Sequence, residues 1–110
     1  MIEETIINYL NLKMSVNVYA EEPEEKEDRY IVIEKTGGYI ENYISHATVA
    51  IKSYADTLFN ASMLNEEVKE KMINIIELEN IQSSKLNSDY NFTDQTKKKY
   101  RYQAVFELIY

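Results

Sequence analysis

The spacing of apolar residues changes within residues 47–59, and this change constrains the fold more than any other feature of the chain. Val49 and Ile51 alternate with less apolar neighbours, which is typical of a half-buried strand. From Leu58 and Phe59 onward, apolar residues recur at helical spacing. Neither Gly nor Pro separates the two patterns. The sequence therefore predicts a strand that runs directly into a helix, in a fold that mixes α and β.

The length and composition favour one soluble domain spanning residues 1–110. No cysteine is present, which excludes disulfides and thiolate metal sites. The acidic start, Met-Ile-Glu-Glu-Thr, lacks the basic region of a signal peptide, and apolar runs fall far short of the about 20 residues of a membrane span. We therefore expect a protein made and assembled in the cytoplasm, without a membrane partner.

The charge and the tyrosine content both bear on the kind of partner. The net charge is −7, which repels phosphate backbones and argues against sequence-specific nucleic-acid binding. The chain has 10 Tyr and no Trp. Tyr is enriched at protein–protein interfaces, but an AT-rich genome would also produce many Tyr codons, so both explanations remain open.

The first half of the chain predicts a helix followed by strands. Residues 2–12 have apolar side chains at intervals of four and acids in the first turn, which favours an amphipathic helix. A short strand follows around residues 16–18, and the acidic run 21–28 with its one proline predicts an exposed loop. Residues 29–36 are rich in β-branched and aromatic residues and predict a strand that Gly37-Gly38 ends.

The second half predicts a helix pair between strands. Residues 39–45 are a loop or the start of the strand 46–54. Two consecutive helices are expected over 55–63 and 66–77, because Asn65 interrupts the apolar stripe and is a plausible N-cap.

The end of the chain predicts two more strands. Residues 79–89 have a weak strand pattern, and 91–96 are a polar turn. Residues 99–110 alternate cleanly, with the face from Tyr100 to Tyr110 that includes Phe106 expected in the core. The order of elements predicts an α+β fold, with an antiparallel (mixed) sheet of about four to five strands and the N-terminal helix and helix pair packed on one face.

No pattern points to catalysis, to a cofactor or to a metal. His46 is the only histidine and has no cysteine or Gly-x-Ser-x-Gly elbow beside it, so a surface or strand-edge histidine is favoured. The run 21–28 lacks the spacing and glycine of an EF-hand. Lys97–Lys99 are favoured as lysines that protect a sheet edge. Glu34 and Lys35 lack the additional acids of a metal-dependent nuclease.

Four segments together resemble a known family. They are Arg-Tyr-Ile-Val-Ile-Glu-Lys-Thr-Gly-Gly at 29–38, the strand, Ser-Tyr-Ala and helix sequence at 47–55, Leu-Asn-Glu-Glu-Val-Lys at 64–69, and the aromatic closing strand at 99–110. In order, spacing and length the chain is similar to the tail-completion proteins, or tail terminators, of long-tailed phages.

The resemblance implies a structural virion protein without catalytic residues. Such a protein caps the tail tube as a ring of about six copies, ends tail polymerisation and joins the tail to the head connector. Genome DNA later passes through the ring. We expect self-contacts and contacts to the tail-tube and neck proteins to involve the following residues: Glu21, Glu22, Glu24, Glu25, Asp28, Tyr39, Tyr43, Arg101 and Gln103.

Three other readings remain open at this point. The chain could be another neck or head-closure protein or a tail-tube subunit, although a tube subunit usually needs a long hairpin that the sequence does not clearly predict. It could be a small metal-dependent nuclease with a buried acidic cluster around His46 or Glu34. It could also be a regulatory interaction protein of a prophage. The size of the ring and the face that lines its lumen are not set by the sequence.

Overall fold

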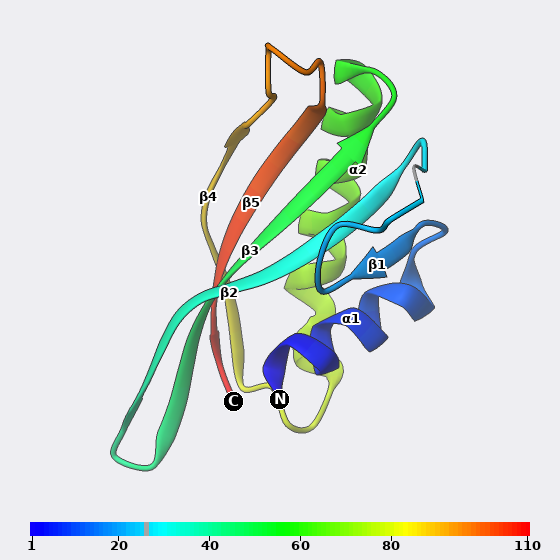
Figure 1. The fold of residues 1–110 in the computed structure, drawn as a ribbon. Coiled ribbons are helices and arrows are strands. Elements are labelled where there is room, and N and C mark those ends of the chain that lie inside the picture. Colours follow the sequence, from blue (N-terminus) through cyan, green and yellow to red (C-terminus); the bar gives the residue numbers. More distant parts are fainter. Residues whose placement is uncertain (26) are drawn as a thin grey trace.

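A mixed sheet with helices on one face forms the fold in the computed structural model, which describes residues 1–25 and 27–110 (Figure 1). The described elements are α1 (Ile2–Lys13), β1 (Asn17–Tyr19), β2 (Tyr30–Glu41), β3 (Ile44–Ala55), α2 (Leu58–Ile73), the 3-10 helix η1 (Asn74–Glu77), β4 (Ser83–Asn91) and β5 (Tyr100–Ile109). The strand order in these residues is β1-β2-β3-β5-β4. Only β1 pairs in parallel, with β2, so the predicted α+β class with a mixed sheet is confirmed.

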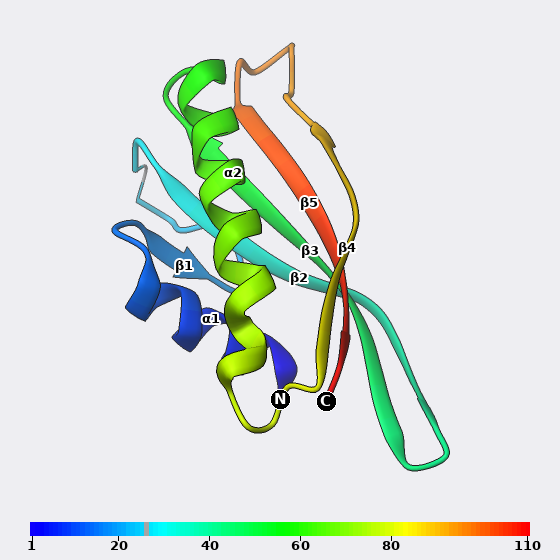
Figure 2. The same cartoon turned by 180° about the vertical axis from the view of Figure 1, so that it is seen from behind.

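The core lies between the sheet and the two α-helices (Figure 2). Ile6 and Leu10 of α1 and Val68 of α2 are fully buried against the sheet. The predicted alternation of the last strand is confirmed, since Phe106 is buried and Glu107 is exposed. Burial of the apolar side of each element drives this packing.

The predicted pair of helices is wrong, because α2 is continuous from Leu58 to Ile73 before it tightens into η1. The strand before it also runs one residue further, to Ala55. Thr57 is the N-cap, and its side chain accepts a hydrogen bond from the backbone N–H of Asn60 at 3.1 Å. Asn65, the predicted N-cap, is instead buried inside the helix and donates to Asp89 at 3.0 Å. That tertiary partner accepts from the side-chain N–H of Asn65, so the residue does not need to cap a helix end and the helix continues through it.

The prediction that Gly37-Gly38 ends the first long strand is also wrong. β2 continues through both glycines to Glu41, with a bulge between Lys35 and Gly37. Gly38 lies against the strand partner so closely that a Cβ there would be 2.8 Å from the carbonyl oxygen of His46. Glycine is therefore required by close backbone approach rather than by a turn.

The turn lies further on, at Asn42 and Tyr43, and it creates a long hairpin. Both residues have positive φ, at 52° and 65°, as the tight I′ hairpin turn requires. The hairpin of β2 and β3 projects beyond the rest of the sheet, as Figures 1 and 2 show. It gives the described chain extents of 44 × 25 × 24 Å. The long hairpin that the sequence did not clearly predict is thus present.

Other boundaries differ modestly from the expected ones. β4 begins at Ser83 rather than at residue 79, and β1 is confined to Asn17–Tyr19. In the described part of the acidic run, residues 21–25 and 27–28, no helix or strand is assigned, as predicted. Lys26 lies outside the described residues.

Candidate assembly surfaces

The contact residues expected from the sequence fall into two groups at opposite ends of the molecule (Figure 1). The acidic loop lies close to the start of β5, which carries Arg101 and Gln103. Tyr39 and Tyr43 belong to the projecting hairpin. The structure therefore brings the acids together with the start of β5 but not with the two hairpin tyrosines.

The acidic loop is attached to the sheet through two of its carboxylates. Glu22 accepts hydrogen bonds from Lys99 Nζ at 2.6 Å and from the Tyr30 hydroxyl at 3.3 Å. The bond from Lys99 holds the pKa of Glu22 below its usual value. Glu27, which the sequence analysis did not select, accepts from the hydroxyl of Tyr19. Glu22 therefore anchors the loop.

The remaining predicted acids of this loop face solvent. Glu21, Glu24, Glu25 and Asp28 are exposed. A hollow of about 510 Å³ separates the loop from the turn between β4 and β5, where Lys97 and Lys98 lie. The prediction that these lysines protect a sheet edge is wrong. They lie in the turn between β4 and β5, whereas the edge strands of the described sheet are β1 and β4. Lys99 instead pairs with Glu22 across the hollow.

A row of aromatic side chains crosses the sheet on the face opposite the helices. Its centre is the stacked pair of Tyr30 and Tyr54, with ring centroids 4.6 Å apart. Arg101 lies over Phe92 at 4.4 Å and donates to the Tyr54 hydroxyl at 3.2 Å. The full row, in strand order, is Tyr19, Tyr30, Tyr54, Arg101, Phe92 and Tyr90.

This row stiffens the open face of the sheet. Gln103 donates to the Tyr90 hydroxyl at 2.6 Å, so both predicted polar residues of β5 support the aromatic row. The ring faces at its centre are occupied by one another, which leaves little flat surface for a planar ligand. The tyrosines of the row were not predicted, because they come from four strands whose pairing local patterns do not set.

The hairpin tip presents apolar side chains to solvent. Tyr43 at the turn is fully exposed, and Ile40 is 75% exposed. Ile44 and Tyr39 are also exposed. Tyr39 belongs to β2, whereas residues 39–45 were predicted as a loop or as the start of the following strand, and its ring is stacked on His46 with ring centroids 4.3 Å apart. Ile40 and Ile44 were not predicted. Both are apolar residues close to Asn42, which is a pattern that a hairpin tip can have. The glycine pair at 37–38 indicated a strand end earlier in the chain, so the tip was not predicted there.

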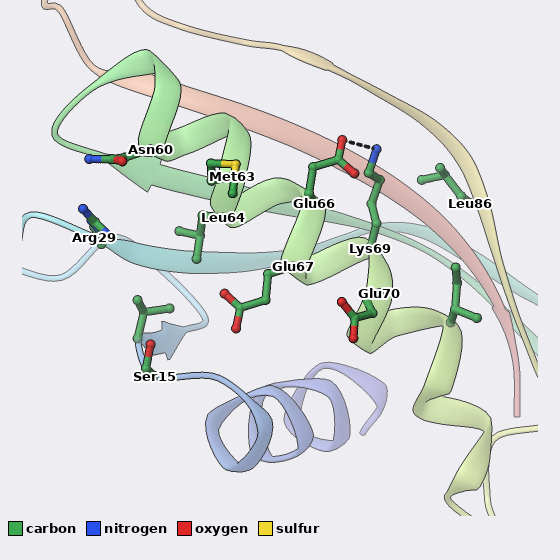
Figure 3. Close-up of a pocket in the computed structure, with 12 residues that line it drawn as sticks. Ser15, Arg29, Asn60, Met63, Leu64, Glu66, Glu67, Lys69, Glu70 and Leu86 are labelled. Atoms are coloured by element: carbon green, nitrogen blue, oxygen red, sulfur yellow. Dashed lines mark ion pairs between the residues drawn. The ribbon is translucent and has the colours of Figure 1, made fainter.

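A groove runs along the outer side of α2 (Figure 3). Its volume is about 790 Å³, and its lining includes Met63, Leu64 and Leu86. The ion pair of Glu66 with Lys69, at 2.9 Å, lies along it. This groove was not predicted, because the sequence pattern indicates two helices in place of the continuous α2.

The geometry of the only histidine does not resemble a nuclease site. His46 lies on β3, between β2 and β5, so it is not on a strand edge. Glu34 pairs with Lys52 at 2.8 Å. Within residues 1–25 and 27–110, no three His, Cys, Asp or Glu side chains are grouped to hold a metal. The buried acidic cluster that a nuclease reading requires is therefore absent from the described residues.

Comparison with known proteins adds no assignment. Neither protein-family models nor curated protein sequences match the chain. In addition, none of the helices in the described part of the chain is long and apolar enough to span a membrane.

Proposed function

We propose that this protein is a tail-completion protein of a long-tailed phage or prophage. Copies would form a ring of about six that caps the tail tube and offers a surface to the head connector. The projecting β2–β3 hairpin with an exposed apolar tip supports a role in assembly. The choice of a terminator among assembly proteins rests on the resemblance of segments 29–38, 47–55, 64–69 and 99–110. An apolar tip held away from the body of a protein is best explained as a contact element.

A ring needs two different surfaces on each copy, and this shape supplies them. The hairpin lies at one end of the long axis, and the acidic loop between β1 and β2 lies toward the other (Figure 1). Contacts between unlike surfaces generate rings when their rotation closes. The role is structural, and genome DNA passes through the lumen without base-specific contacts.

The acidic loop suits a contact to a different protein. Its exposed carboxylates, with those of Glu24 and Glu25 near its middle, disfavour contact with a second acidic copy. We assign this end to the tail-tube or neck protein. The site of action is accordingly the tail–neck junction of the virion, after assembly in the host cytoplasm.

A tail-tube subunit is the second candidate, and the long hairpin favours it. Tube subunits usually have such a hairpin. In this chain β2 and β3 form one, joined by the two turn residues 42 and 43. The two candidates differ in position, because a tube subunit repeats along the tail whereas a terminator occupies one end.

The test is electron microscopy of particles from a phage in which this gene is deleted. A terminator predicts overlong or frayed tails that accumulate apart from DNA-filled heads. Absence of any tail tube would instead assign the chain to the tube itself, and free tails of normal length would indicate a neck role. Intact infectious virions would exclude all three roles.

A further inference from the structure

The carboxylate of Glu22 lies in a small polar site on the open face of the sheet. Its Oε1 atom accepts from Lys99 Nζ at 2.6 Å and from the Tyr30 hydroxyl at 3.3 Å. Tyr30 is 8% exposed, and its ring stacks on Tyr54, which is 5% exposed. The donors thus belong to β2 and to the residue that precedes β5, and the loop supplies only the carboxylate that fills the site.

The loop that carries Glu22 has few other attachments. None of residues 20–25 has a buried side chain. In this described segment, Glu22 makes both of the side-chain hydrogen bonds to the rest of the chain. Its ion pair is open to water, with 47% of the Glu22 side chain and 42% of the Lys99 side chain exposed. Exposed ion pairs contribute little to stability, so Glu22 can leave the site at a small cost in free energy.

The charge around the hollow between the loop and the β4–β5 turn is compatible with a carboxylate from outside. If residues 20–25 move away, Glu22 and Glu24 leave the lining of the hollow. The cations that stay are Lys97, Lys98, Lys99, Arg101 over the Tyr54 ring, and Arg29, which pairs with Asp56. The acids that stay are Glu27, Asp28 and Asp56. Cations therefore exceed acids at this place, although the net charge of the chain is −7.

We infer that Lys99 and Tyr30 form a carboxylate-binding site, which Glu22 occupies in the free chain and which a Glu or Asp side chain of a partner takes over. The partner is a protein with an exposed acidic segment like residues 20–25, because the site already holds that chemistry. Hydrogen bonds from a cation to a carboxylate are stronger than those between neutral groups. Lys99 also holds the pKa of Glu22 below its ordinary value, so the ionised form is favoured there.

Glu22 acts in this account as an internal competitor. A group tethered beside its site has a high effective concentration, so Glu22 keeps weakly binding acidic segments out. Only a segment that is held nearby by further contacts displaces it. The inference does not rest on the phage role, because it concerns the purified chain.

The test removes the internal carboxylate and supplies one from outside. The probe is the capped peptide Ala-Glu-Glu-Pro-Glu-Glu, which has the sequence of residues 20–25. It is titrated at low salt into isotope-labelled protein, and the backbone amide shifts of residues 97–101 report binding at the site. The matched control peptide has Gln in place of the second Glu. Thermal unfolding of each protein variant shows that it is folded.

Glu22→Ala should bind the peptide about 10-fold more tightly than the parent chain does, because its site is empty. In the Glu22→Ala background, Lys99→Ala should weaken binding by about 10-fold, because a charge-assisted hydrogen bond is lost. The matched change is Lys97→Ala in the same background, at an exposed lysine of the same turn. It should weaken binding by less than about 3-fold.

Three results would overturn the inference. They are equal affinity of Glu22→Ala and the parent, equal losses from Lys99→Ala and Lys97→Ala, and equal binding of the two peptides. A single-stranded oligonucleotide of the same charge is the fourth arm. If it bound Glu22→Ala more tightly than the peptide does, the site would recognise phosphate and the assignment to a carboxylate would be wrong.

Discussion

At the scale of the residue, Asp89 connects the outermost strand to the helix layer. Its Oδ2 atom accepts hydrogen bonds from Lys69 Nζ at 2.8 Å and from Asn65 Nδ2 at 3.0 Å. Asn65 is buried, so loss of its partner leaves a polar group unsatisfied away from water. One carboxylate thus holds β4 against α2.

Replacement of Asp89 by Ala should lower the free energy of unfolding by about 1–3 kcal/mol, because a buried donor loses its acceptor. Urea denaturation followed by circular dichroism measures the change. The matched control is Glu79→Ala, an exposed acid that should change stability by no more than about 0.5 kcal/mol. Equal effects of the two substitutions would contradict this role of Asp89.

The same carboxylate predicts a pH dependence. The hydrogen bond from Lys69 lowers the pKa of Asp89 below its ordinary value. A lowered pKa means that the stabilisation is present above the unfolded-state pKa, near 3.9, and disappears as pH falls through the folded-state pKa. The stability difference between the parent chain and Asp89→Ala should therefore shrink below about pH 4. A difference that stays constant down to pH 2 would argue against the ion pair.

The contacts of these residues were only partly predictable from the sequence. Asn65 interrupts the apolar stripe, and its polarity predicts a helix cap at that position. Its partner Asp89 is 24 positions away, and no local pattern connects them. Tyr30 and Tyr54 were likewise unpredictable as a stacked pair, because their contact depends on the register of β2 with β3.

At the scale of the element, the two glycines of β2 predict opposite effects. A Cβ at Gly38 would lie 2.8 Å from the His46 carbonyl oxygen, whereas a Cβ at Gly37 would meet nothing within 4 Å. Gly38→Ala should therefore loosen the hairpin, at a cost of about 1–3 kcal/mol, and Gly37→Ala should be tolerated.

Hydrogen exchange of the amides of residues 39–45 measures this difference directly. Faster exchange is expected in Gly38→Ala and unchanged or slower exchange in Gly37→Ala. Identical exchange in the two variants would mean that the close approach at Gly38 does not constrain the hairpin.

The start of α2 provides a second test at this scale. Thr57 caps the helix by accepting from the N–H of Asn60. Thr57→Ala should cost about 1 kcal/mol, while Thr57→Ser should retain most of the stability because its hydroxyl can make the same bond. Thermal melting of the three proteins distinguishes them, and equal melting temperatures would rule out a contribution from the cap.

Most elements followed from local patterns, and the errors share a cause. β-Branched and aromatic residues predicted the first part of β2, and alternation of apolar and polar residues predicted most of β3 and β5. The glycine pair has low strand propensity, yet pairing with β3 carries the strand through it. The turn signal was instead Asn42, which tolerates positive φ, followed by Tyr43, where positive φ is unusual.

At the scale of the whole molecule, the class of fold was predictable and the surfaces were not. The period change at residues 47–59 indicates a fold that mixes α and β, and the order of the other elements indicates the α+β class. The aromatic row, the α2 groove and the projecting tip each depend on how distant strands and helices meet. Sequence patterns therefore indicated some of the residues on these surfaces, such as Tyr43 and Arg101, but not the residues that surround them.

The position of the protein on the phage particle tests the central claim most directly. A small peptide tag on the N-terminal residue, before α1, would allow gold-labelled antibodies to locate the chain on purified virions by electron microscopy. The account predicts label confined to the junction of tail and head. Label along the length of the tail, or particles that bind no more label than untagged virions do, would contradict a tail-completion role.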